Sequence, residues 1–250
     1  MKNLDLSYLD LENIDLEAAN FYGSTLRQSK LNRTDLRKAN LTKANFYEAS
    51  LKEASLIGAN FQEANFQKAN LQGAKLDVTK LRGANLHGAI LQSFDLKNVD
   101  LNGFDLQKVN LCRANLQQTN LHEAYLQGAN LQDANLQDAN LQGADLEKCN
   151  LSGTNLLRVN LKDAKLQRAN LQGADLRGAN LRVANLQEVN LQGANLDNAN
   201  LEEVDLLNAK NIPFEMLLKV RSLYRVKSLK TKIERRLKGL KPELFEYPSE

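Results

Sequence analysis

Residues 129–148 read ANLQDANLQDANLQGADLEK, and this stretch decides the fold. Leucine returns at every fifth residue, with asparagine or aspartate directly before it and alanine two positions before it. An α-helix would spread these leucines around its whole circumference, and a flat strand places every second residue on one face. A strict period of five fits neither element and indicates a repeat architecture.

The period continues outward from this stretch in both directions. From Leu6 to Leu206 all 41 positions spaced by five, the centres, are Leu (37) or Phe (4). The residue two before a centre, the small position, is Ala in 24 repeats and Ser, Thr, Cys or Val in 12 others. The residue directly before a centre, the turn position, is Asn or Asp in 32 repeats. With no Trp and only 6% aromatic residues, the core must consist mainly of Leu and Ala.

These preferences have a physical reading. The centre and the small position are two residues apart, so in extended backbone their side chains point the same way. Asn, Asp and Gly favour turns, and 12 of the 13 Gly lie two residues after a centre. Each repeat is therefore a short extended piece with a bend. One coil of such repeats has no core alone, so we expect a solenoid in which stacked coils build the core together.

This pattern resembles the pentapeptide-repeat family, whose motif is A(D/N)LXX. The motif stands here as ANLQD at residues 129–133 and as ADLRG at 174–178, in a match that covers residues 4 to about 208. The resemblance implies an all-β solenoid, a right-handed quadrilateral β-helix with four repeats per coil and about ten coils. We expect this β-helix to span residues 1–210 and a basic α-helical cap and tail to span residues 211–250.

Large residues replace the small residue at two places in the array. At the first, they either plug the open end of the core or form the contact of an end-on homodimer, because an uncapped edge invites pairing. The residues there are Leu4, Leu9 and Ile14. At the second, a full coil of large residues predicts local expansion, with a functional bend or binding waist as the alternative. The residues of this coil are Phe94, Val99, Phe104 and Val109.

The outward positions carry few distinctive features. Between Arg27 and Lys43 six basic residues face one acid, Asp35. In a 20-residue coil this run wraps all sides as a belt, so we interpret it as solvated surface rather than a nucleic-acid patch. Four apolar residues are scattered at positions expected to face solvent: Ile57, Val78, Leu157 and Val183.

The C-terminal segment differs from the repeats. Residues 211–250 hold 10 basic and 5 acidic residues, which leaves 23 basic and 25 acidic residues in residues 1–210. Pro213 suits the start of a first helix, whose apolar stripe is Met216, Leu217, Val220, Leu223 and Tyr224. A capping box at 231–234 (TKIE) predicts a second helix that Gly239 ends. These helices should cap the last core layer.

The exposed basic face of this segment is the candidate interaction site, since it also suits an acidic partner or an anionic membrane surface. Its residues are Arg221, Arg225, Lys227, Lys230, Lys232, Arg235, Arg236 and Lys238.

The sequence predicts no reaction chemistry. His87 and His122 fall on different sides of the expected coil, which makes them poor partners for a metal. Cys149 takes an inward small position and Cys112 lies outward alone, so neither suits a nucleophile or a disulfide framework. No glycine-rich phosphate loop is present. We expect no catalytic, cofactor or metal residues, no small-molecule substrate, and a soluble cytoplasmic protein without a signal peptide.

The leading hypothesis is a non-catalytic structural or interaction scaffold whose partner is another protein, while nucleic acid and membrane are disfavoured. The family resemblance adds one alternative, a regulator that binds DNA gyrase by imitating duplex DNA. Such mimicry needs a strongly acidic surface, and residues 1–210 are nearly balanced in charge. Peripheral binding to an anionic surface through the basic tail is the other alternative.

Overall fold

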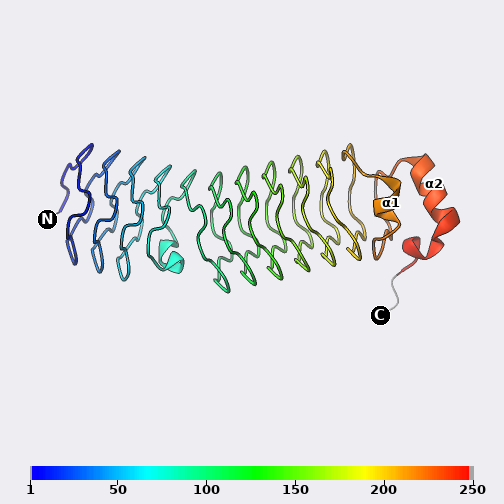
Figure 1. The fold of residues 1–250 in the computed structure, drawn as a ribbon, viewed down its shortest axis with the longest axis horizontal. Helices are drawn as coiled ribbons and strands as arrows, with labels where there is room; N and C mark the ends of the chain where they lie inside the picture. Colours follow the sequence, from blue (N-terminus) through cyan, green and yellow to red (C-terminus); the bar gives the residue numbers. More distant parts are fainter. Residues whose placement is uncertain (1, 248–250) are drawn as a thin grey trace. The chain divides into compact units, whose positions relative to one another are not determined.

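The structure is a computed structural model that describes residues 2–247, and it shows a chain that coils upon itself at regular intervals (Figure 1). Parallel β-bridges join residues 20 positions apart, such as Asp5 with Thr25 and Asn160 with Asn180. One turn therefore consists of four five-residue repeats. Within residues 2–247 these bridges are isolated pairs rather than long strands. The predicted solenoid of repeats that build a common core is confirmed.

The repeat at residues 161–165 shows why this sequence forms coils. Its first and third amides donate to the next coil over 2.7 and 3.0 Å, and its fifth donates to the preceding coil over 3.0 Å. The second amide, of Lys162, donates to the Asn160 side chain over 3.2 Å. The fourth closes the turn on the carbonyl of the first over 3.1 Å. All five donors are satisfied, because the Asn side chain accepts from the one amide that no carbonyl reaches.

The bend in each repeat needs an unusual backbone conformation. The residue two after the centre adopts a positive φ in nearly every repeat, as in Gly173 at 67° and Lys148 at 59°. Glycine adopts this region without a steric penalty, whereas a β-branched residue such as Val183, at 61°, does so against its preference. The concentration of Gly at this position follows from the bend.

The centres form the core. From Phe21 to Leu206 every centre is buried except Leu76, which is half-buried. Most small positions are also buried, and polar residues there bond to the backbone. The Thr119 hydroxyl donates to the Leu96 carbonyl over 2.7 Å, and other buried polar residues do the same within their own turns. The interior is therefore apolar without leaving these hydroxyls unsatisfied.

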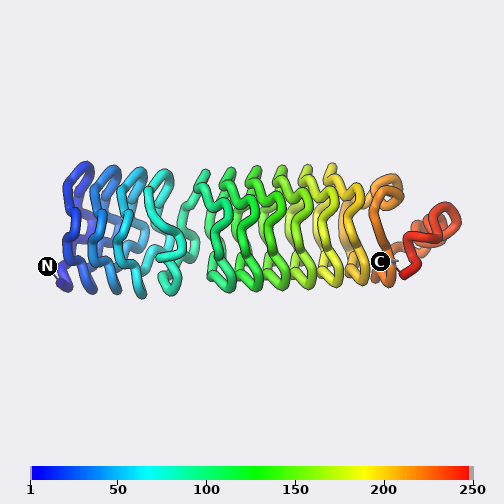
Figure 2. The backbone as a smooth tube through the Cα atoms, turned by 90° about the horizontal axis from the view of Figure 1, so that it is seen from below, coloured from blue at the N-terminus to red at the C-terminus, as the bar shows by residue number. Residues whose placement is uncertain are grey.

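The chain divides into two compact units, each built of such coils (Figure 2). The first holds the residues up to Phe94 and Asp105–Ala114, and the second holds Asp95–Phe104 and the residues from Asn115 onward. The coil in which large residues replace the small ones is shared between the units: two of its four large residues belong to each unit. Phe94, Phe104 and Val109 are buried and Val99 is half-buried, while the expansion of their coil stays a prediction.

The first coil is open on one side. Leu4 is half-buried there, and Leu9 and Ile14 are 44% and 41% exposed. The amides of Thr25 and Lys30 donate to the Leu4 and Leu9 carbonyls, so the first coil pairs with the second. Its large residues thus lie where the core meets solvent, and both the plug and the end-on homodimer stay predictions.

A short 3₁₀ helix, η1 (Val78–Leu81), interrupts the repeats of the first unit. The Asp77 side chain accepts from the Thr79 amide over 3.0 Å and so caps this helix. The turn carries Val78 inward to 6% exposure and leaves Thr79 exposed. The prediction that Val78 faces solvent is therefore wrong, because the 3₁₀ turn shifts the inward position by one residue. Ile57 and Val183 are exposed as predicted.

The chain makes a further turn after residue 210 instead of the predicted first helix. Helix α1 spans only Phe214–Leu217, and the chain then pairs with the last repeats through the bridges Asn200–Ser222 and Asp205–Lys227. These bridges span 22 residues, two more than a regular turn. The prediction that the first helix extends to Tyr224 was wrong. Residues 219–227 instead form hydrogen bonds with the backbone of residues 198–206, the edge of the last regular coil. Leu217 and Val220 are buried all the same, and Tyr224 is half-buried.

The second predicted helix is present as α2 (Thr231–Leu240), followed by the 3₁₀ helix η2 (Pro242–Phe245). The predicted capping box is wrong: Lys230 is the N-cap and no side chain caps the helix. Gly239 lies inside α2, one residue before its end. Leu237 of α2 and Leu244 of η2 are buried. No helix within residues 2–247 has the length and apolar character needed to cross a membrane.

Candidate interaction surfaces

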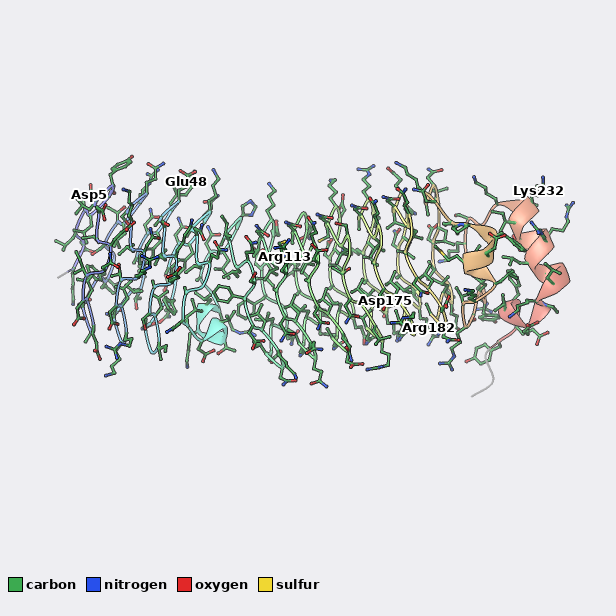
Figure 3. All side chains as sticks on the ribbon, in the orientation of Figure 1. Asp5, Glu48, Arg113, Asp175, Arg182 and Lys232 are labelled. Atoms are coloured by element: carbon green, nitrogen blue, oxygen red, sulfur yellow. The ribbon has the colours of Figure 1, made fainter. Side chains whose placement is uncertain are left out.

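The basic C-terminal surface is formed by the eight predicted cations, all of which are exposed. Arg221, Arg225 and Lys227 lie on the irregular last turn, Lys230 precedes α2, and the remaining four lie on α2. Figure 3 shows the side chain of Lys232 extending from α2 into solvent. The structure thus gathers all eight on one segment that folds against the last repeats.

Four cations of this surface have an interaction within the segment or with the last repeat. Lys238 pairs with Glu234 at 2.6 Å, and the Arg236 guanidinium lies 4.0 Å from the centroid of the Phe214 ring. Arg225 stacks over Tyr224, and Lys227 lies near Asp205. The other four, Arg221, Lys230, Lys232 and Arg235, have no ion pair within residues 2–247.

The acids of the last repeats hold this segment in part. Lys219 lies 3.9 Å from Asp197, and the Ser228 hydroxyl donates to Asp205 over 3.0 Å. Burial acts to raise the pKa of Asp205, but bonds from Gln187, an amide and Ser228 outweigh it and leave the pKa lowered. The acids of the last repeats therefore meet part of the charge of this segment, and they leave most of its basic charge facing solvent.

The cations of the repeats are placed differently. Lys30, Arg33 and Lys43 pair with acids one coil away, at 3.4, 3.0 and 3.6 Å from Asp10, Glu53 and Glu63. In the second unit Arg158 pairs with Asp138 at 2.7 Å and Arg168 with Glu188 at 3.1 Å. Arg177 pairs with its neighbour Asp175, which Figure 3 labels. In the predicted belt Lys30, Arg33, Arg37, Lys38 and Lys43 thus each pair with an acid, whereas the Arg27 guanidinium lies 5.1 Å from the centroid of the Tyr47 ring.

A hollow that the sequence did not predict lies beside the basic C-terminal surface. Its volume is about 660 Å³, and its walls come from the last repeats and from the start of α2. The apolar wall residues include Leu206, Leu207, Ile212, Leu229 and Ile233. The only sequence signal for it is the loss of the five-residue period at 211–213, where the two-residue insertion begins.

The residues considered for chemistry stay apart. No group of three or more His, Cys, Asp or Glu in residues 2–247 could hold a metal ion. Cys149 is buried, its thiol donates to the Leu126 carbonyl, and burial raises its pKa to about 12. Cys112 is a free, half-buried thiol, and the His122 ring nitrogen lies 3.4 Å from the Asn102 side-chain oxygen.

Two profiles of known families match the chain. One, described as pentapeptide repeats, matches eight copies at residues 1–37, 95–133, 114–153, 144–182 and 184–210. The other, described as a pentapeptide repeat region, matches residues 36–106. No curated protein matches the chain.

Solved structures of pentapeptide-repeat proteins are also similar. HetL of the cyanobacterium Nostoc sp. strain PCC 7120, involved in heterocyst differentiation regulation, is 32% identical over 83% of this chain and 89% of its own, with a TM-score of 0.49. A thylakoid-lumen protein of Arabidopsis thaliana is 31% identical over 41% of this chain and 68% of its own, with a TM-score of 0.30. QnrB1, a plasmid-mediated fluoroquinolone resistance protein, is 18% identical over 94% and 96%, with a TM-score of 0.33.

The family profiles together cover the same residues in which the five-residue period, the buried centres and the 20-residue bridges occur. This chain therefore belongs to the pentapeptide-repeat family.

Proposed function

We propose that this protein is a non-catalytic interaction scaffold that binds an acidic protein partner through the basic C-terminal surface. One contrast supports the proposal. Most cations of the repeats pair with acids, as Arg33, Arg158 and Arg168 do, and the unpaired ones, such as Lys52 and Lys97, are scattered along the described repeats. Arg221, Lys230, Lys232 and Arg235, by contrast, lie on one segment and have no ion pair within residues 2–247. An exposed ion pair contributes only about 0.2–1 kcal/mol, so these four cost little to leave unpaired and are available to a partner. Clustered charge of one sign also speeds the encounter with an opposite surface.

The repeats contribute a stiff support in this proposal. Most of their backbone donors bond to a neighbouring coil or close a turn, and nearly all of their centres from Phe21 onward are buried. A surface held on such a support loses little conformational entropy when a partner binds. We further propose right-handed, four-sided coils, about ten in all, as the family resemblance indicates. A cytoplasmic location is also proposed, because the two thiols, Cys112 and Cys149, are free and suit a reducing compartment.

Affinity capture from the native host tests the proposal. The intact chain is compared with a variant in which Arg221, Lys232 and Arg235 are changed to Gln, and with a control in which Arg158 and Arg168 are changed to Gln. We expect a partner that is retained by the control, lost by the first variant and released by raised salt. Equal capture by all three proteins would contradict the assignment of the basic surface.

Two alternatives are separated by direct assays. Flotation with vesicles that contain phosphatidylserine tests an anionic membrane surface, and we expect the intact chain to stay unbound. A gyrase supercoiling assay tests the DNA-mimicking alternative. We expect no effect at micromolar concentration, because residues 1–210 hold nearly equal numbers of basic and acidic residues.

A further inference from the structure

The hollow beside α2 has the size and lining of a small-molecule site. Its volume of about 660 Å³ lies within the range of about 300–1,000 Å³ that is typical of ligand pockets. Among the described residues that line it, none is aromatic, so a ring would find no partner for stacking. An aliphatic chain suits these walls better. The large apolar residues that form them are Leu206, Leu207, Ile212, Leu229 and Ile233.

Leu207 is apolar at a position that the preceding coils keep polar. One, two and three coils earlier the equivalent residues are Gln187, Gln167 and Glu147. The exchange coincides with the hollow, since Leu207 is one of its wall residues and is 46% exposed. A ligand that covers Leu207 would remove this apolar surface from water, which favours binding.

The charge in the walls is confined to one residue. Lys230 is the only charged residue among the described wall residues, and it has no ion pair within residues 2–247. It directly precedes α2, whose N-terminus no side chain caps. Because a helix N-terminus carries partial positive charge, α2 adds to the effect of Lys230. An occupant with an aliphatic chain and a single negative group therefore matches the lining.

A neighbouring hollow sets the orientation of such an occupant. This second hollow, of about 270 Å³, adjoins the first at Gly193. Its charged wall residues are Asp197, Glu215 and Lys219, so acids outnumber cations on that side. A negative group is repelled there and attracted to Lys230, which lines the first hollow alone.

We propose that this hollow binds an aliphatic monocarboxylate, the chemical class of a free fatty acid. The chain lies against Leu207, Ile212 and Ile233, and the carboxylate faces Lys230. The ligand is bound rather than converted, since the described walls hold no His, Cys or acidic residue. The inference goes beyond the proposed function, because it assigns a small-molecule ligand in addition to a partner protein.

Methyl NMR on the full chain tests the proposal, because the sequence holds only five isoleucines. Ile212 and Ile233 line the hollow, whereas Ile14, Ile57 and Ile90 belong to the first unit and serve as internal controls. The probes are octanoate, decanoate and dodecanoate below the concentrations at which they form micelles. We expect shifts at Ile212 and Ile233 alone. Each added CH₂ should tighten binding about threefold to fourfold until the hollow is filled.

The charge of the ligand is tested at Lys230. Lys230→Gln should weaken decanoate about two- to fivefold, the range of an exposed ion pair, and should leave neutral decanol unchanged. Lys232→Gln is the matched control and should change neither, because Lys232 is also exposed and without an ion pair in residues 2–247 but does not line the hollow. Equal affinity of the intact chain for decanoate and decanol would overturn the assignment of a carboxylate.

The apolar wall is tested at Leu207. Leu207→Gln introduces the residue type of the two preceding coils, so the variant should fold, and it should weaken decanoate at least about threefold. Ile57→Gln, at a residue that is 56% exposed in the first unit, should have no effect. Equal binding by the two variants, or decanoate shifts at Ile14 and Ile90, would overturn the proposal.

Flotation with vesicles that contain phosphatidylglycerol separates a free carboxylate from the acyl chain of a membrane lipid. We expect no flotation that depends on Leu207. Flotation that Leu207→Gln abolishes, with no shift by decanoate, would assign the hollow to membrane contact and overturn the proposal. The variant of Arg221, Lys232 and Arg235 keeps Lys230 and should bind decanoate as the intact chain does. Partner capture and ligand binding therefore succeed or fail independently.

Discussion

Asparagine at the turn position makes two kinds of contact at once. The Asn160 oxygen accepts from the Lys162 amide over 3.2 Å and from the Asn180 amide group over 3.1 Å. Its nitrogen donates to the Asn140 oxygen over 3.0 Å. The side chain thus closes its own turn and links three coils, which explains why the position prefers Asn in the second unit.

Substitution of Asn160 separates these contacts. Asn160→Ala removes all of them and should lower the free energy of unfolding by about 2 kcal/mol. Asn160→Asp keeps both acceptor roles but places a carboxylate against the Asn140 oxygen, so we expect a loss of about 1 kcal/mol at pH 7 that shrinks below pH 4 as the carboxyl is protonated. Urea unfolding at pH 7 and below pH 4 measures the free energy of unfolding of each variant. Asn98→Asp, at an exposed position outside any ladder, is the control, and equal effects would contradict the ladder's role.

Val183 carries local strain. It is β-branched and has a φ of 61°, a backbone conformation that raises the free energy of the folded state. Its side chain is 39% exposed, so burial offsets this cost only in part. Asn198 and Asn208 adopt the same region at 60° and 56°. Val183→Asn should raise the free energy of unfolding by about 1 kcal/mol in urea titration. A loss of stability would show that the packing of Val183 outweighs its strain.

The two thiols should differ in reactivity. Burial raises the pKa of Cys149 to about 12, so this residue holds almost no thiolate at neutral pH, while Cys112 is half-buried. Iodoacetamide should label Cys112 alone in the native protein and both cysteines in denaturant, as read by mass spectrometry. Rapid native labelling of Cys149 would mean that its coil opens frequently.

At the scale of elements, α2 depends on one buried side chain. Leu237 is fully buried, whereas Leu240, at the end of the same helix, is 60% exposed. Leu237→Ala should cost about 3 kcal/mol, and Leu240→Ala, the matched control, should have little effect. Hydrogen exchange of α2 and urea unfolding measure both. Equal effects would show that α2 is not docked through Leu237.

The irregular last turn shows how tertiary contacts override local preference. Residues 213–224 have the apolar spacing of a helix, yet only Phe214–Leu217 is helical. The last regular coil ends in a free backbone edge, and pairing satisfies the Arg221 and Lys227 amides with the Ala199 and Val204 carbonyls at 2.8 Å each. Burying these donors and acceptors without partners would cost more than the helix would gain.

At the scale of the whole molecule, many small electrostatic contacts set the response to acid. A hydrogen bond from Arg158 lowers the pKa of Asp138, and one from Arg177 lowers the pKa of Asp175. A carboxyl whose pKa is lowered on folding stabilises the protein above its unfolded pKa, near 4, and loses that contribution as the pH falls through its folded value.

Stability should therefore be flat between about pH 6 and pH 8 and should fall below about pH 4. Each pair is exposed, so each effect is small and only their sum is visible. Urea midpoints measured across this range test the prediction. Asp138→Asn should make the decline shallower, and a decline that begins above pH 6 would show that groups other than these carboxylates control it.

The array itself could be predicted because its information is local and repeated. Leu131 and Leu136 are buried for the same reason as every other centre, and the turn Asn and the left-handed residue appear in each repeat with the same spacing. Val78 escaped prediction because a single 3₁₀ turn changes which residue points inward. The hollow beside α2 escaped it because it arises between segments that are distant along the chain.

The sequence by itself determined the solenoid, the buried column of centres and the bend chemistry, since a period of five repeated 41 times leaves one way to bury the leucines together. The tertiary structure alone decided how the array ends. After residue 210 the five-residue repeat no longer determines which residues lie side by side. The unpaired backbone edge of the last coil then forms hydrogen bonds with residues 219–227, which would otherwise continue a helix. The extra two residues of that turn leave the Gly193 and Leu196 amides without an acceptor among residues 2–247, because hydrogen bonding between coils requires a register that a local pattern does not contain.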